Sequence, residues 1–133
     1  MFHLYNPNPI GSDGVGDCAV RAVAKALGTT WEDAYTRLSV AGFLAGDMPN
    51  SDAVINTVLR ENGFKRCGVP NTCPDCYTIA DFAKDHPIGT FVVKSENHVT
   101  AVGDGTIYDA FDSSRRVPMY FWEKTEEQTE RND

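Results

Sequence analysis

The sequence predicts an α+β domain in which helices from the N-terminal part pack on an antiparallel β-sheet from the C-terminal part. Apolar residues recur at helical spacing as far as His86-Pro87, and from Thr90 to Trp122 they fall in short strand-like runs. Helices followed by strands are typical of this fold class. The 133 residues suffice for one domain, which we place at 1–122, followed by a polar tail at 123–133 that we expect to fray.

Four helices are expected before the strands, each preceded by a residue that can cap its N-terminus. The expected caps are Asp17, Thr30, Ser51 and Thr78. After Asp17 the apolar residues share one helix face as far as Leu27, and Gly28 is a typical helix stop. Residues 1–16 are rich in proline and glycine and are expected to form an irregular arm. Residues 64–77 are expected to form a loop or a short strand.

Four strands are expected at 90–93, 98–102, 106–111 and 117–122. Asp104-Gly105 is a strong signal for a two-residue hairpin turn between the second and third of these strands. With that turn, Gly103 faces Thr106 and His98 faces Phe111. The alternation of side chains then places His98 and Asp109 on the same face of the hairpin, as diagonal neighbours.

Composition and charge exclude several classes of protein. Hydrophobic residues make up 41% of the chain, which favours a packed core over disorder. The net charge of −7 argues against binding of nucleic acid, which requires a basic surface. No apolar run is long enough to span a membrane, and the first residues lack the pattern of a secretory signal. We therefore expect a cytoplasmic location and no membrane partner.

Cys18 is a candidate nucleophile because it follows the expected cap of the first helix directly. The partial positive charge and unpaired N–H groups of a helix N-terminus lower the pKa of a thiol there, and the thiolate is the reactive form. The Cys18 N–H could also donate a hydrogen bond to a developing oxyanion. The competing interpretation is that Cys18 is a small buried residue of the first turn. Arg21, one turn later, either favours the thiolate, binds a substrate carboxylate or, as we prefer, pairs with an acidic residue.

His98 and Asp109 are the candidate base and its orienting carboxylate. A histidine that accepts the thiol proton needs an anion behind its ring to fix the tautomer and stabilise the imidazolium. The predicted register gives this role to Asp109. Asp112 is the alternative, because a bulge of one residue would turn it to the same face.

The order Cys18, His98, Asp109 resembles papain-like cysteine peptidases, and in size and layout the chain is most similar to the compact bacterial C39-like peptidases. The resemblance covers residues 17–28 and 90–112. The chain also resembles small uncharacterised phage and gut-bacterial proteins that begin Asn-Pro-Asn-Pro and continue into Gly-Asp-Cys-x-x-Arg-Ala, which adds residues 5–9. The resemblance implies a papain-like fold, a Cys-His-Asp triad and hydrolysis of a peptide, isopeptide or amide bond of a peptide or protein substrate. It implies no cofactor.

Two departures from the papain pattern bear on activity. Papain-like enzymes place an oxyanion-hole glutamine about six residues before the cysteine, and here Ser12 occupies that position. Asn6 or Asn8 could supply the missing amide if the arm folds over the helix start, and Ser12 is the alternative donor. The aromatic residue expected after the cysteine is replaced by Ala19. A degenerate peptidase groove that only binds a protein partner, for example in a phage-encoded protein, is therefore the alternative function.

Cys67, Cys73 and Cys76 form a weaker candidate cluster. Their spacing resembles part of a zinc site, with His86 or Asp75 as a fourth ligand. No second Cys-x-x-Cys and no spaced His pair accompanies them, so unligated thiols are the preferred interpretation. A zinc-stabilised interaction domain is a third hypothesis, which metal analysis would decide.

Overall fold

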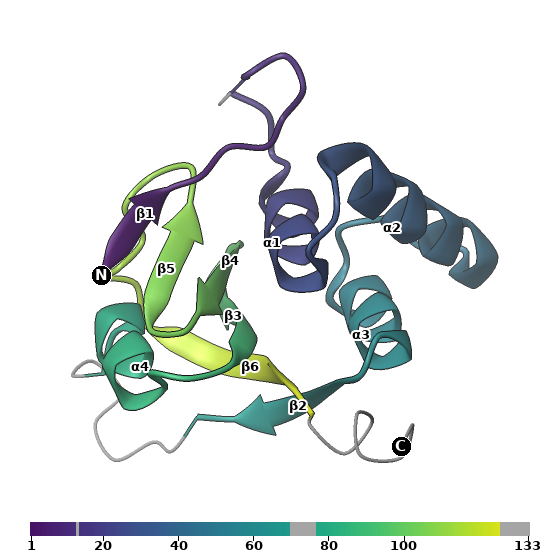
Figure 1. The fold of residues 1–133 in the computed structure, drawn as a ribbon. Coiled ribbons are helices and arrows are strands. Elements are labelled where there is room, and N and C mark those ends of the chain that lie inside the picture. The colour runs from purple at the N-terminus through teal and green to yellow at the C-terminus, as the bar shows by residue number, and fades with distance from the viewer. Residues whose placement is uncertain (13, 70–76, 126–133) are drawn as a thin grey trace, which may run out of the picture.

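The computed structural model describes residues 1–12, 14–69 and 77–125, and in that part of the chain a central sheet is covered by helices on both faces. Figure 1 shows α1, α2 and α3 grouped on one side of the sheet and α4 on the other. The predicted α+β class is confirmed at this level: helices pack against a sheet that is mostly antiparallel.

The sheet has six strands in the order β1-β5-β4-β3-β6-β2 across the described residues. Their bounds are β1 Phe2–Leu4, β2 Phe64–Gly68, β3 Thr90–Ser95, β4 His98–Gly103, β5 Thr106–Asp109 and β6 Pro118–Lys124. Every neighbouring pair is antiparallel except β1 and β5, which run parallel. The predicted register of the β4–β5 hairpin is confirmed, since Gly103 pairs with Thr106 and Val102 with Ile107.

The helices begin and end close to the predicted signals. Their bounds are α1 Cys18–Leu27, α2 Trp31–Ala45, α3 Asp52–Glu61 and α4 Ile79–Asp85. The side chains of Thr30, Ser51 and Thr78 each accept a hydrogen bond from an N–H of the first turn, as expected of an N-cap. Gly28 ends α1 in the left-handed conformation, with a φ of 66°.

Alternate side chains of the central strands enter two separate cores. Val92 of β3 and Trp122 of β6 pack with the apolar faces of α1, α2 and α3. Their neighbours Phe91 and Phe121 point to the opposite face and pack with Phe82 of α4. Because both faces are covered, the middle strands read as continuous apolar runs rather than as an alternating pattern.

Three features differ from the sequence prediction. Residues 2–4, expected within an irregular arm, form β1 because they pair with the edge of β5, a contact that no local pattern reveals. Strand β5 ends at Asp109 rather than at residue 111. Strand β6 continues through Lys124 by pairing with β2, so the first two residues of the expected frayed tail belong to the sheet. Residues 126–133 lie outside the described part.

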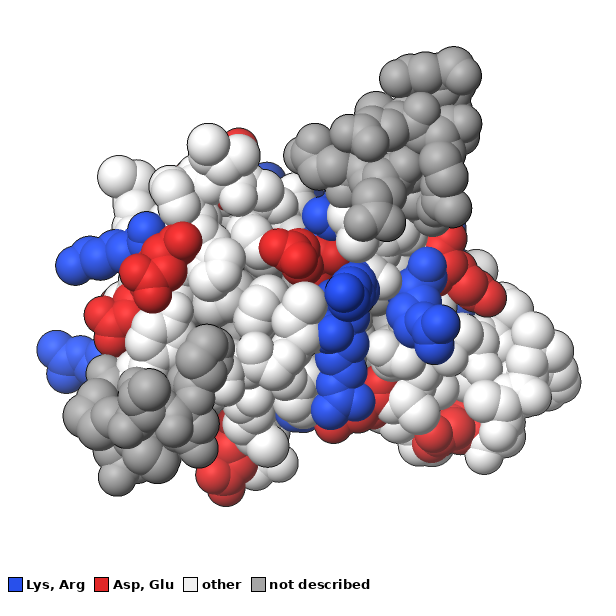
Figure 2. Space-filling model, turned by 90° about the horizontal axis from the view of Figure 1, so that it is seen from below, with Lys and Arg blue, Asp and Glu red and all other residues white. Residues whose placement is uncertain are grey.

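Within the described residues, no helix combines the length and the apolar character needed to cross a membrane. The charged side chains of the face in Figure 2, which is seen from below, are of both signs. Among the coloured residues of that face, Lys and Arg side chains are interspersed with Asp and Glu and form no continuous basic area.

Candidate active site

Three elements meet at the open end of the β4–β5 hairpin. Cys18 is the first residue of α1, His98 is the first residue of β4, and Asp109 is the last residue of β5. The paired residues of the hairpin run from Gly103–Thr106 to Ala101–Tyr108, so that His98 and Asp109 follow beyond the last pair. The strands therefore present both side chains at one end of the sheet, next to the start of α1.

His98 and Asp109 form the buried pair that the hairpin register predicts. The Nε2 atom of His98 lies 2.7 Å from Oδ2 of Asp109, and the two residues are only 4% and 3% exposed. The Asp109 carboxylate is held by two further donors. The Ser113 hydroxyl donates to Oδ2 at 2.7 Å, and the Ala110 N–H donates to Oδ1 at 2.8 Å. The carboxylate therefore has a fixed orientation, and it fixes the plane of the imidazole.

The pKa values of His98 and Asp109 are shifted in the directions that favour an ion pair between them. Burial alone would lower the pKa of His98, but the hydrogen bonds with Asp109 and Cys18 and the charges of both outweigh it and raise the pKa. Burial alone would raise the pKa of Asp109, but the hydrogen bonds from His98 and Ser113 lower it on balance. Both shifts favour the imidazolium–carboxylate form.

The Cys18 thiol lies in the pocket that His98 also lines, close enough for the two groups to affect each other's ionisation. Burial opposes its ionisation, but a hydrogen bond with His98, one with the Val99 backbone, and the positive charges of His98 and Arg21 outweigh burial, and its pKa is lowered. Because Nε2 of His98 is bonded to Asp109, the ring nitrogen that remains for the thiol is Nδ1. A thiol, an imidazole and a carboxylate in this order can form a thiolate–imidazolium pair.

Asp17 occupies the N-cap position of α1, but its side chain does not cap the helix. Its carboxylate instead forms an ion pair with Arg21 and accepts hydrogen bonds from Trp31 Nε1 at 2.9 Å and from the Asn8 amide at 3.2 Å. The preferred interpretation of Arg21 is confirmed, since it is buried and paired with Asp17, and it lies 3.8 Å from Asp109. The first N–H groups of α1 are thus left without a side-chain cap, next to the thiol.

The structure does not bring the predicted oxyanion-hole side chains to the thiol. The Asn6 amide donates to the carbonyl oxygens of Gly11 and Ser12, at 3.5 and 3.2 Å. The Asn8 amide donates to Asp17, and its oxygen accepts from the Ile10 N–H. Both amides are therefore engaged in holding the arm in shape and fixing it to the start of α1. Asn6, Asn8 and Ser12 do not line the pocket beside Cys18.

Asp112, the alternative orienting carboxylate, lies on the exposed loop after β5 and accepts a hydrogen bond from the Ser114 N–H. The hairpin has no bulge that would turn Asp112 towards His98, because the β4–β5 register runs without a shift. Of the two candidates, Asp109 is the residue that contacts the imidazole.

A pocket of about 380 Å³ opens beside the thiol. Its lining includes Gly16 and Cys18 at the start of α1, Asn97 and His98 at the β3–β4 turn, and Phe111 and Arg116 in the loop after β5. The rings of Phe111 and His98 lie 4.8 Å apart. The reactive groups are thus open to a ligand on one side and packed on the other.

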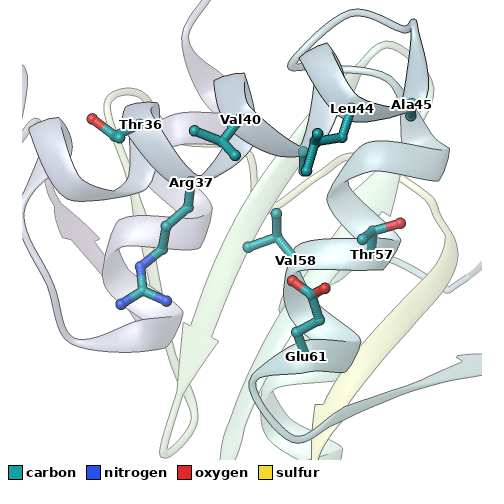
Figure 3. Close-up of a pocket in the computed structure, with 9 residues that line it drawn as sticks. Thr36, Arg37, Val40, Leu44, Ala45, Thr57, Val58 and Glu61 are labelled. Atoms are coloured by element: carbon teal, nitrogen blue, oxygen red, sulfur yellow. The ribbon is translucent and has the colours of Figure 1, made fainter.

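A larger pocket of about 510 Å³ lies between α2 and α3, away from these groups. Figure 3 shows Val40 and Leu44 of α2 facing Val58 of α3 across it. Arg37 and Glu61 are the charged residues of its lining, and Arg37 is paired with Asp33. Its lining contains no cysteine, serine or histidine, so we place the candidate active site in the smaller pocket.

The candidate zinc ligands are described only in part. Cys67 lies in β2, where its thiol is 3.7 Å from the Lys65 carbonyl oxygen, and Cys73, Asp75 and Cys76 lie outside the described residues. His86 follows α4, with Nδ1 2.7 Å from the Phe82 carbonyl oxygen and its ring stacked on Phe82. Within residues 1–12, 14–69 and 77–125, no group of three potential ligands is close enough to hold a metal ion.

The residues of the site that were not predicted from the sequence as site residues include Phe111, Ser113 and Arg116. The sequence does indicate that Phe111 lies near the site, because the predicted hairpin register places it opposite His98. Ser113 and Arg116 lie in a loop whose course depends on hydrogen bonds with α4, and periodicity gives no signal for it.

No family model, curated protein or solved structure matches this chain.

Proposed function

We propose that this protein is a papain-like cysteine hydrolase that cleaves a peptide, isopeptide or amide bond. The observation that carries the proposal is that three side chains from separate elements come together: His98 is bonded to Asp109 and shares a pocket with Cys18. Asp109 lies 2.7 Å from Nε2 of His98, and Cys18, whose pKa is lowered with His98 among the causes, lines the same pocket as the imidazole. A merely structural histidine needs neither a buried carboxylate nor a thiol in the same pocket.

The reaction follows from this arrangement. The Cys18 thiolate attacks the carbonyl carbon of the substrate, and the carbonyl π electrons move to the oxygen. As the tetrahedral intermediate collapses, the imidazolium of His98 gives its proton to the leaving amine, and an acyl thioester remains on Cys18. Water then attacks the thioester carbonyl while neutral His98 accepts one of the water's protons. The second tetrahedral intermediate collapses with cleavage of the C–S bond, the acid product leaves, and the proton stays on His98, which restores the thiolate–imidazolium pair.

The start of α1 is the proposed oxyanion site. The Asp17 side chain is bound to Arg21, Trp31 and Asn8 and does not cap the helix. The Cys18 N–H is therefore a candidate donor to the oxyanion, supported by the positive end of the helix dipole.

One observation favours the alternative, a binding module with a degenerate groove. The Asn6 amide is engaged within the arm and the Asn8 amide is bonded to Asp17, so neither supplies the side-chain donor that papain-like enzymes use. Loss of one oxyanion donor lowers the catalytic rate by about 10²–10³-fold. A domain of this kind would bind a peptide without acylating its thiol.

Acylation by p-nitrophenyl acetate distinguishes the two functions, because this ester needs no specific binding. We expect a burst of nitrophenol and an acetyl group on Cys18, identified by peptide mass spectrometry, followed by slow deacylation. Cys18→Ala should abolish the burst, and His98→Ala should reduce it at least tenfold at pH 7. Cys67→Ala is the matched control and should leave the burst unchanged, since Cys67 lies in β2 and its pKa is raised by burial and by the neighbouring Glu123.

Acetylation of Cys18 that is no faster than that of Cys67, or that is equally fast in His98→Ala, would overturn the hydrolase proposal. Binding of a peptide with no acylation would instead support the degenerate groove.

A further inference from the structure

We propose that Arg116 makes the pocket beside Cys18 selective for substrates that carry a carboxylate close to the reacting acyl group. The inference rests on the proposed function for the identity of the reacting group, and it adds the substrate class. Arg116 lines the same pocket as Cys18 and His98, from the loop that follows β5.

Two guanidinium groups line this pocket, and that of Arg116 is not paired with a carboxylate of the described residues. The other guanidinium, that of Arg21, is buried between two carboxylates, those of Asp17 and Asp109. Arg116 is exposed and forms no ion pair with a carboxylate of the described residues. Since the chain carries a net charge of −7, a cation without a carboxylate partner in the same pocket as the nucleophile favours anionic ligands there.

The backbone of Arg116 is held in place by the same loop that fixes the triad. Its carbonyl oxygen accepts a hydrogen bond from the Ile79 N–H at the start of α4, and its N–H donates to the Ser113 carbonyl oxygen. The Ser113 hydroxyl in turn donates to Asp109. The position of Arg116 is therefore fixed relative to the imidazole by a few successive contacts, which lowers the entropic cost of binding a ligand there.

The Arg116 side chain is oriented but leaves most of its donors free. Its Nη1 atom lies 3.5 Å from the Glu96 carbonyl oxygen, at the limit of a hydrogen bond, and its guanidinium carbon lies 5.4 Å from the centre of the Phe111 ring. Phe111 also contacts His98, so it connects the cation to the reactive centre. A guanidinium has five N–H donors in a planar fork that matches the two oxygens of a carboxylate. Of the anionic groups that an unmodified peptide or protein substrate carries, the carboxylate is the one that fits this group.

Two substrate groups can supply that carboxylate, an acidic side chain next to the cleaved bond or a free α-carboxylate at a chain end. Three chloroacetyl probes separate them and label Cys18 without requiring turnover. Chloroacetyl-glutamate α-amide carries a side-chain carboxylate, chloroacetyl-glycine carries a terminal one, and chloroacetyl-glutamine α-amide is neutral. The labelling rate of each is measured by mass spectrometry in the wild-type protein and in R116Q, R116K and R115Q.

In the wild-type protein we expect at least one acidic probe to label Cys18 about fivefold faster than the neutral probe, the upper range of one solvent-exposed ion pair. The preference should vanish in R116Q and persist in part in R116K. It should be unchanged in R115Q, which makes the same change in net charge at an exposed neighbour outside the pocket lining. The acidic probe that shows the preference identifies the source of the carboxylate.

An acidic-to-neutral ratio that is the same in R116Q and in the wild-type protein would overturn the inference. So would a ratio that falls equally in R115Q, because it would then report net charge alone. The proposed function is read separately from the absolute rate with the neutral probe and its dependence on His98. Slow labelling of Cys18 by the neutral probe would count against the proposed hydrolase. The ratio of the acidic to the neutral labelling rate would still decide the role of Arg116.

Discussion

Replacement of Asp109 by asparagine should destabilise the fold in a pH-dependent way. Asparagine keeps the shape of the side chain, but it removes the charge that faces His98 at 2.7 Å and Arg21 at 3.8 Å. His98 and Asp109 are both nearly fully buried, so solvent screens their interaction little. Loss of one partner of a buried charged pair costs about 3–5 kcal/mol. We expect about 3 kcal/mol at pH 5.5, because the asparagine oxygen replaces part of the hydrogen bonding.

The sign of the pH dependence follows from the two pKa shifts. The pKa of His98 is raised in the folded state, so its stabilisation is complete below the unfolded value of about 6.5 and is lost as the pH rises through the folded value. The pKa of Asp109 is lowered, so its contribution is complete above about 3.9 and is lost as the pH falls through the folded value. The His98–Asp109 pair therefore contributes most to the free energy of unfolding between about pH 4 and pH 6.5.

The assay is urea unfolding of Asp109→Asn at pH 5.5 and at pH 9, in a Cys18→Ala background that removes the titration of the thiol. The loss of unfolding free energy should be about 1–2 kcal/mol larger at pH 5.5. The loss that remains at pH 9 reflects the hydrogen bond from Ser113 and the ion pair with Arg21. Asp112→Asn is the matched control, since Asp112 is exposed and does not contact His98. An equal loss at both pH values, or a larger loss at pH 9, would refute the proposed imidazolium–carboxylate pair.

Three further substitutions test the fold around the site. Thr78→Ala removes the capping box of α4 and should cost about 1 kcal/mol, seen as a fall of about 3–5 °C in Tm; an unchanged Tm would show that the cap contributes nothing. Leu38→Ala empties a fully buried position of α2 and should cost about 2–5 kcal/mol in urea unfolding, whereas a loss below about 1 kcal/mol would contradict the packing. Asn8→Ala removes a donor to Asp17 and an acceptor for Ile10 and should cost about 1–3 kcal/mol, with faster hydrogen exchange at the Ile10 amide. Unchanged exchange there would contradict the role of Asn8 in the arm.

Local signals in the sequence predicted much of the site, because the two key elements are defined by short-range chemistry. The turn residues Asp104-Gly105 set the hairpin register, and the register alone places Asp109 next to His98. The start of α1 at Cys18 follows from Gly16-Asp17 and the helical spacing after it. These predictions required no knowledge of how distant segments pack.

Predictions that depended on tertiary contacts fared less well. Asp17 has the sequence context of a helix cap. Its carboxylate binds the buried Arg21 guanidinium, one turn away, and the Trp31 indole instead of the first N–H groups of the helix. Strand β1 forms only because β5 offers an unpaired edge, and β6 extends to Lys124 only because β2 lies beside it. Arg116 reaches the pocket because its loop is bound to the start of α4, a contact between segments about 35 residues apart that periodicity does not encode.

The central claim, that His98 activates Cys18, is tested most directly by the pH dependence of alkylation. The rate of Cys18 modification by iodoacetamide should follow a titration midpoint below the ordinary thiol pKa of about 8.5, and His98→Ala should move that midpoint upward. Cys67 in the same sample serves as the internal reference, with a midpoint above the ordinary value. A midpoint for Cys18 at or above that of Cys67, unmoved by His98→Ala, would contradict the account.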